Sequence, residues 1–197
     1  MRSAINPSNI GSNYPSAWPI VEPARRLHYT ETTPSLSAAK ECRPMPVLKP
    51  LVKADIRALY RLRVRSDQET FVGPNGLTMA QAPFEPGSEI FGIWEGETAV
   101  GLLAIIDFSH PQADLQDGDD PNSLYIWRLL IDADHQKRGY GTLALNHAKK
   151  MMHDKSLPAL YIAAVDKAGS AIPLYEREGF CRTGRIVEGE TELIWRP

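Results

Sequence analysis

The longest hydrophobic runs of this chain have the length of β-strands, and a segment with helical periodicity separates them. Residues 124–131 (LYIWRLLI) and 160–165 (LYIAAV) are almost continuously apolar, which is typical of strands buried on both faces. Between them, residues 141–153 repeat apolar side chains such as Leu145, Ala148 and Met152 along one side, with polar side chains opposite. The pattern predicts a strand, an amphipathic helix and a second buried strand.

The remaining segments extend this alternation of strands and helices. One helix is predicted over residues 54–65, and another begins after Ser170, which can cap it and leave Pro173 at the third helical position, where no intrahelical amide bond is needed. Gly179 then ends that helix. Further strands are predicted over residues 45–52, 89–95, 98–108, 180–186 and 190–195. The pattern favours an α/β (α+β) fold, a mixed sheet flanked by helices.

Residues 1–44 differ from the rest of the chain. They are rich in Pro, Ser, Thr and Asn, and they show neither helical nor alternating periodicity. No continuous apolar stretch follows the basic start, so a secretory signal is not expected. We expect a poorly ordered extension over residues 1–44 and one domain over residues 45–197. A transit peptide, a misassigned start and a partly docked arm stay open as alternatives.

Composition narrows the class of protein. With 197 residues, 43% hydrophobic and 23% charged, the chain is ordinary for a globular domain. Its apolar runs fall far short of the ~20 residues of a spanning helix. A net charge of −2 gives no general attraction to nucleic acid or to acidic membranes. Two cysteines provide no disulfide framework, which favours a reducing compartment, and we expect a cytoplasmic protein.

The connection after residues 124–131 carries candidate chemistry. Residues 136–142 read QKRGYGT and lead directly into the predicted helix. Glycines let a backbone approach a ligand closely, and the amides and dipole of a helix N-terminus favour an anion there. Lys137 and Arg138 add positive charge. Two glycines alone are a weak signal, because many such turns carry them for tight turning only.

A second motif supplies context for this turn. Residues 174–180 read LYEREGF, again where a helix leads into a strand. The pattern Q-x-x-G-x-G followed by L-Y-E-x-x-G-F resembles the GNAT superfamily of N-acetyltransferases, over about residues 45–196. The resemblance implies a mixed, mostly antiparallel sheet of about six to seven strands flanked by about four helices. It also implies that the turn cradles the pyrophosphate of acetyl-coenzyme A, the co-substrate.

The resemblance further implies roles for individual residues. The strand over residues 124–131 would splay from its neighbour, so that its main chain bonds the pantetheine arm and polarises the thioester carbonyl. Tyr175 would protonate the departing thiolate, although a tyrosine on such a helix can also be a plain core aromatic. The implied cofactor-binding residues are Leu129, Leu130, Ile131, Gln136, Lys137, Arg138, Gly139, Tyr140, Gly141 and Thr142.

Two positions depart from the family pattern. Ala168 stands seven residues before Tyr175, where family members commonly place an asparagine that bonds the pantetheine. The two residues after Ala168 could compensate for that loss. Trp127 and Arg128 stand where some members carry a glutamate that acts as general base. The candidates for a base elsewhere are Glu69, Asp67, Asp107 and a chain of waters.

Phe71, Val72, Asn75 and residues 79–82 resemble the segment that lines the acceptor side in bacterial spermine/spermidine acetyltransferases. Residues 182–184, with residues 188–190 after them, resemble the ending of the same enzymes. That narrower resemblance implies a primary amine as acceptor, such as a polyamine or diamine. The loop over residues 109–123 contains four aspartates that could attract a cationic amine, but a charge-rich loop more often simply faces water.

We therefore expect an acetyl-coenzyme A-dependent N-acetyltransferase that acts on a small-molecule primary amine by direct attack in a ternary complex. The five histidines show no metal-ligand grouping, so no metal is expected. Neither nucleic acid nor membrane is an expected partner, and a homodimer is one expected assembly. The alternatives are a protein N-terminus, a lysine or an aminoglycoside as acceptor, and a non-catalytic acyl-coenzyme A-binding module.

Overall fold

The computed structural model describes residues 44–197. Residues 1–43, all but the last position of the expected extension, lie outside the described residues, so that expectation stays a prediction. The longest described helix, α3 (Tyr140–Asp154), has 15 residues. Within residues 44–197, no helix is both long and apolar enough to cross a membrane.

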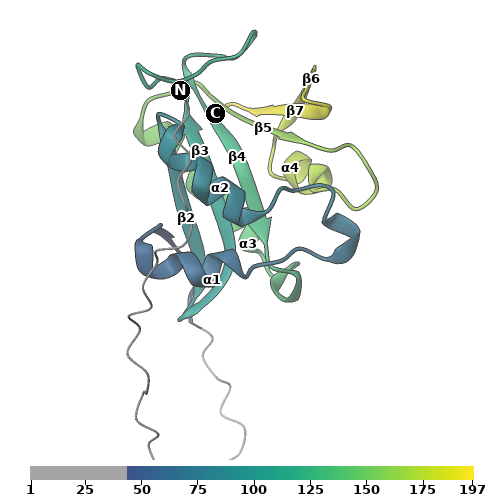
Figure 1. The fold of residues 1–197 in the computed structure, drawn as a ribbon. Helices are drawn as coiled ribbons and strands as arrows, with labels where there is room; N and C mark the ends of the chain where they lie inside the picture. The colour runs from purple at the N-terminus through teal and green to yellow at the C-terminus, as the bar shows by residue number, and fades with distance from the viewer. Residues whose placement is uncertain (1–43) are drawn as a thin grey trace, which may run out of the picture. The chain divides into compact units, whose positions relative to one another are not determined.

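Seven strands form a single mixed sheet. They are β1 (Val47–Pro50), β2 (Ser88–Glu95), β3 (Thr98–Asp107), β4 (Ser123–Ile131), β5 (Ala159–Ala164), β6 (Cys181–Val187) and β7 (Glu190–Trp195). Their order across the sheet is β1-β2-β3-β4-β5-β7-β6, so the proline-containing β1 is an edge strand and β4 is central (Figure 1). Only β4 and β5 run parallel; every other neighbouring pair is antiparallel. The predicted mixed, mostly antiparallel sheet is confirmed.

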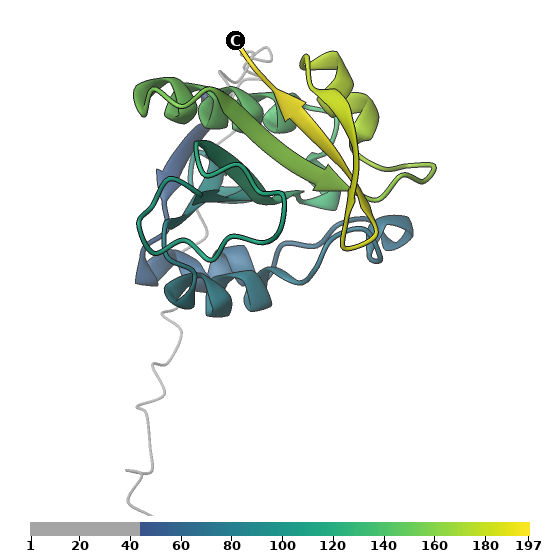
Figure 2. The same cartoon turned by 90° about the horizontal axis from the view of Figure 1, so that it is seen from above.

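Helices cover both faces of this sheet. One face carries α1 (Ile56–Tyr60) and α2 (Asn75–Gln81), and the other carries α3 and α4 (Ile172–Arg177), as Figure 2 shows. Short 3₁₀ turns complete the described chain: η1 (Lys53–Asp55), η2 (Ser66–Gln68), η3 (Ala82–Phe84) and η4 (Ala133–His135). The predicted number of four helices is therefore confirmed for the described residues.

Each face of the sheet has its own hydrophobic core, and β4 contributes to both. Leu124 and Ile126 pack toward α3, where they join Leu145 in one buried cluster. Leu130 belongs to the cluster on the opposite face, together with Leu59 of α1. Burial of each large aliphatic side chain contributes about 1.5–3 kcal/mol, so both faces hold β4 firmly. This confirms that residues 124–131 form a strand buried on both sides.

The first helix is shorter than its sequence pattern predicts. It was expected over residues 54–65, but α1 ends at Tyr60. The Arg63 side chain folds back, and its Nη1 donates to the carbonyl oxygens of Tyr60 (2.6 Å) and Leu62 (2.8 Å), which takes up carbonyl groups at the helix end. Two apolar side chains of this short helix, Ile56 and Tyr60, are 44% and 55% exposed.

The last helix begins one residue later than predicted. Ala171, not Ser170, is its N-cap, and no side chain caps it. The Ser170 amide instead donates to the Lys167 carbonyl at 3.1 Å, because the chain is still turning there. Pro173 therefore takes the second helical position, where its missing amide is equally harmless. The predicted stop at Gly179 is confirmed by its left-handed φ of 87°.

Candidate active site

The two parallel strands at the centre of the sheet pair only at their beginnings. β4 and β5 are in register over residues 123–126 and 159–162, and they diverge beyond Ile126 and Ile162. The divergence opens a cleft of about 720 Å³ lined by residues 126–131 of β4 and by residues 162–165. The edge of β4 beyond Ile126 has no strand partner on the β5 side within the described chain. The splay expected from the sequence is therefore present.

A β-bulge in β4 decides which side chains face this cleft. Between the pairs Ala104–Arg128 and Ile105–Ile126, β4 contains one residue more than β3, and that residue is Trp127. Without the insertion, Arg128 would share a face with Ile126; with it, Arg128 turns to the face of α1 and α2. There its Nε donates to Thr78 Oγ1 at 3.2 Å.

The turn between β4 and α3 has an unusual backbone. Lys137 and Gly139 both take left-handed conformations, with φ of 61° and 88°. A non-glycine residue in that region is strained by about 1–2 kcal/mol, and such strain is concentrated at ligand sites. A Cβ at Gly139 would meet nothing within 4 Å, whereas one at Gly141 would lie 2.8 Å from Leu174 Cδ2. Gly139 thus serves the turn, and Gly141 serves the close packing of α3 against α4.

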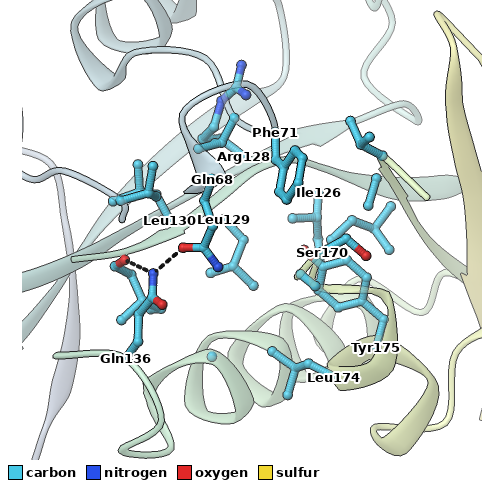
Figure 3. Close-up of a pocket in the computed structure, with 18 of the residues that line it drawn as sticks. Gln68, Phe71, Ile126, Arg128, Leu129, Leu130, Gln136, Ser170, Leu174 and Tyr175 are labelled. Carbon is cyan, nitrogen blue, oxygen red and sulfur yellow. Dashed lines mark hydrogen bonds between the residues drawn. The ribbon is translucent and has the colours of Figure 1, made fainter. Parts of the chain in front are cut away.

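A pair of glutamines ties this turn to two other segments. Gln136 Nε2 donates to the Ile131 carbonyl at 3.2 Å and to Gln68 Oε1 at 2.7 Å (Figure 3). Gln68, from η2, in turn donates to the Gly169 carbonyl at 3.3 Å. We call this chain of amides the glutamine strap. It joins the two sides of the cleft and was not foreseen from the sequence.

The structure brings most of the predicted site residues together. Those that line the cleft are Leu129, Leu130, Ile131, Gln136, Lys137, Gly139, Tyr140, Gly141, Thr142 and Tyr175. Arg138 is exposed and does not line it, because its side chain leaves the turn toward solvent. Ala168 is also exposed outside the lining, while Gly169 and Ser170 take part in it.

Tyr175 is both a core residue and a cleft residue. It is only 4% exposed, and its ring packs against Phe180 at a centroid distance of 6.1 Å. Burial, and then the negative charge of Glu190, raise the pKa of the Tyr175 phenol well above its usual value. A phenol with a raised pKa stays protonated at neutral pH and is available as a proton donor.

None of the base candidates named from the sequence lines the cleft. Asp67 forms an ion pair with Arg65 (2.6 Å), and Asp107 forms one with Lys155 (2.9 Å). Glu69 is exposed outside the lining. Glu190, at the start of β7, is the one carboxylate among the described lining residues. Burial raises its pKa and the Arg128 charge opposes that shift.

The aspartates of the loop over residues 109–123 do not line the cleft either. Asp119 and Asp120 accept backbone hydrogen bonds from Gln116 and Asn122 inside the loop. The loop instead contacts the β6–β7 hairpin, where Arg185 donates to the main-chain carbonyls of Asp117 (3.1 Å) and Gly118 (2.6 Å). These contacts favour the interpretation of the aspartates as a solvated turn.

Comparison with known proteins gives a family. The model of the "Acetyltransferase (GNAT) family" matches residues 56–180. A relative from Oceanobacillus iheyensis, described as "Uncharacterized N-acetyltransferase OB1458", is 27% identical over 113 residues. That alignment covers 56% of this chain and 65% of the relative, so the chain spans slightly less than two thirds of the relative's length.

Solved structures share the fold at low sequence identity. An acetyltransferase from Thermus thermophilus has a TM-score of 0.62 at 18% identity, covering 77% of this chain and 97% of its own. A GNAT family acetyltransferase from Elizabethkingia anophelis, solved with acetyl-CoA bound, has a TM-score of 0.54 at 13% identity, covering 77% and 98%.

The PaiA N-acetyltransferase from Thermoplasma acidophilum, solved in complex with coenzyme A, has a TM-score of 0.57 at 11% identity. The likeness covers 78% of this chain and 99% of that one. Since the family model matches more than half of the sequence, and the sheet is built as in these structures, the chain belongs to the GNAT family of acetyltransferases.

Proposed function

We propose that this GNAT-family chain transfers the acetyl group of acetyl-coenzyme A to the primary amine of a small molecule by direct attack in a ternary complex. The observation that carries the proposal is the divergence of β4 and β5, which leaves one cleft between the β4–α3 turn and Tyr175. Its volume of about 720 Å³ falls in the range of small-molecule sites, ~300–1,000 Å³. Direct attack requires such a shared cleft, because donor and acceptor are bound together.

The cleft offers matching groups for two parts of acetyl-coenzyme A, the anionic pyrophosphate and the amide-containing pantetheine. Gly141 and Thr142 lie in the first turn of α3, where a helix presents amides without intrahelical acceptors and the positive end of its dipole. Lys137 adds a positive charge beside them. We assign the pyrophosphate to this turn and the pantetheine to the unpaired edge of β4 at Leu129 and Leu130. The Ile131 carbonyl is engaged by Gln136 already.

In the proposed reaction, the lone pair of a neutral amine attacks the thioester carbonyl carbon. A carbon–nitrogen bond forms, the carbon–sulfur bond breaks, and the electron pair leaves with sulfur. The amine loses one proton to a base or to water, and the thiolate gains one, so the products are an amide and a free thiol. Backbone donors near Leu129 and Leu130 would stabilise the oxyanion, a contribution of about 3 kcal/mol in comparable sites.

Tyr175 is the proposed donor of the proton to sulfur. Its phenol lines the cleft, and its raised pKa keeps it protonated at neutral pH. Because the pKa of Glu190 is also raised, that carboxylate is better suited to accept a proton than a fully exposed one. We therefore assign Glu190, rather than the residues named from the sequence, as the first candidate for the base.

The cleft has little negative charge to attract the polyamine acceptor that the sequence resemblance implies. Glu190 is the one carboxylate that lines it in the described chain, and Arg65, Arg128, Lys137 and Arg177 line it as well. A second ammonium group of a diamine would therefore find repulsion more readily than a partner. Diamines and polyamines belong in the acceptor test as one defined class beside amino acids, aminoglycosides and peptides.

The experiment is an acceptor screen with the purified chain and acetyl-coenzyme A, in which thiol release is recorded and each product is identified by mass. We expect release above background hydrolysis with at least one small-molecule amine. Gly139→Asp is the matched control, because a carboxylate at the turn repels the phosphates and should abolish coenzyme A binding. Tight coenzyme A binding with no release for any amine would identify a non-catalytic binding module instead.

A further inference from the structure

Arg128 is a charged side chain without a charged partner in the described structure. Its Nε bonds to the neutral Thr78 hydroxyl, and no carboxylate within residues 44–197 lies within the 4.0 Å of an ion pair. No hydrogen bond in that part of the chain uses its two terminal nitrogens. The four N–H donors on the two terminal nitrogens of the guanidinium fork therefore remain for a ligand.

The surroundings of Arg128 hold this fork in place at an energetic disadvantage. Burial lowers the pKa of the guanidinium, an effect that the charge of Glu190 opposes. A Cβ at Gly73 would come within 3.1 Å of Arg128 Nη2, so the side chain packs closely under the loop before α2. A partly desolvated charge is unfavourable unless it is paired, and a bound anion would supply the missing pair.

Glu190 lies close enough to Arg128 to influence its pKa, but it does not form an ion pair with it. The two side chains line the same cleft and influence each other's pKa. They nevertheless form no ion pair, because no side-chain nitrogen of Arg128 lies within 4.0 Å of a Glu190 carboxylate oxygen. The space between them is bounded by a positive group on one side and a negative group on the other. A molecule with both an anionic and a cationic group matches it.

The phosphates of the donor do not account for Arg128. The β4–α3 turn, with Lys137 and the first turn of α3, lies on the α3 side of the sheet, whereas the bulge directs Arg128 to the α2 side. In Figure 3, Arg128 lies on the far side of the cleft from Gln136 and Tyr175.

We propose that the acceptor amine carries a carboxylate, as an amino acid does, and that the terminal nitrogens of Arg128 bind this carboxylate while Glu190 faces the amine. The inference rests on the proposed function and narrows its acceptor to one chemical class. Arginine suits the task because its planar fork binds a carboxylate through two parallel hydrogen bonds. Arg128 is thereby a specificity-determining residue.

Matched acceptor pairs test this inference directly. We choose L-lysine with cadaverine, L-ornithine with putrescine, and glycine with methylamine, because the members of each pair differ only by the carboxylate. In the wild-type protein, kcat/KM should favour the carboxylate member of at least one pair by about 10- to 100-fold, the effect of charge-assisted hydrogen bonds. Arg128→Met should remove that preference, and Arg128→Lys should restore part of it.

Arg61→Met is the matched control, because Arg61 is exposed and does not line the cleft. It should keep the wild-type preference. Coenzyme A affinity and circular dichroism would test whether Arg128→Met is folded. If that variant does not fold, the comparison of acceptor pairs in the wild-type protein still tests the inference.

The outcomes separate the two proposals. Thiol release with equal kcat/KM for both members of every pair overturns the role of Arg128 and leaves the acetyltransferase proposal intact. A preference that survives in Arg128→Met overturns it too. Coenzyme A binding without release for any amine overturns the proposed function, and the inference about its acceptor falls with it.

Discussion

Replacing Tyr175 by phenylalanine isolates the proposed proton donor from the packing around it. The substitution removes one oxygen and keeps a ring that is 4% exposed and lies against Phe180. No group within residues 44–197 hydrogen-bonds to this hydroxyl, so its loss orphans no buried partner there. We expect the free energy of unfolding to change by less than about 1 kcal/mol.

The expected effect on the chemical step is much larger. Loss of a positioned general acid lowers kcat by about 10²–10⁴-fold, which corresponds to roughly 3–5 kcal/mol in the barrier. The affinity for coenzyme A should change little, since the phenol acts on sulfur only as the bond breaks. Burial and Glu190 raise the pKa of Tyr175, so the wild-type donor stays protonated and the rate ratio between wild type and variant should be constant from about pH 6 to 9.

Single-turnover thiol release measures this ratio without interference from slow product release. Tyr161→Phe is a suitable control, because Tyr161 lies on β5 and does not line the cleft. If Tyr175→Phe retains single-turnover rates within about threefold of Tyr161→Phe over that pH range, Tyr175 is a core aromatic and the proton comes from elsewhere.

Three further substitutions test other parts of the site. Gly139→Ala should lower the free energy of unfolding by about 1–2 kcal/mol in chemical denaturation, because φ is 88° there; an unchanged value would contradict the left-handed turn. Gln68→Ala should change stability by less than about 1 kcal/mol but accelerate coenzyme A release in stopped-flow experiments, and an unchanged release rate would show that the glutamine strap does not restrain the ligand. Glu190→Gln should raise the melting temperature at pH 7 but not near pH 4. The pKa of Glu190 is raised in the folded state, so this residue contributes its full stabilisation below the unfolded-state pKa of about 4.3. That stabilisation is lost as the pH rises through the folded-state pKa. A lower melting temperature of this variant at pH 7 would contradict that sign.

The elements with strong periodicity were predictable, and their ends were less so. Residues 124–131 and 141–153 differ by at most a residue or so from β4 and α3, because long apolar patterns leave little choice of face. The predicted helix over residues 54–65 was too long, since the Arg63 side chain competes for carbonyl groups that a longer helix would use. Propensity alone contains no information on such a contact.

The missed site residues depend on contacts between distant parts of the chain. Gln68 donates a hydrogen bond to Gly169, 101 positions away, and neither segment contains a sequence pattern that would predict this contact. Glu190 follows a turn glycine and looks like any surface residue until β7 is placed against β5. Arg128 did give a signal: a charged residue inside a strand buried on both faces is anomalous, and the bulge at Trp127 is its physical cause.

The contact between the β6–β7 hairpin and the loop over residues 109–123 bears on how the sequence of this loop could diversify. Arg185 donates hydrogen bonds to main-chain oxygens of that loop. Gly118 leaves room for the Arg185 side chain, because a Cβ at position 118 would come within 2.8 Å of Arg185 Nη2. The fastening therefore does not depend on which side chains the loop carries. Apart from that glycine, and from Asp119 and Asp120, whose side chains accept hydrogen bonds inside the loop, substitutions there would leave the hairpin that carries Glu190 fastened. This loop, which lies outside the cleft, can therefore vary in sequence while the β6–β7 hairpin keeps its position.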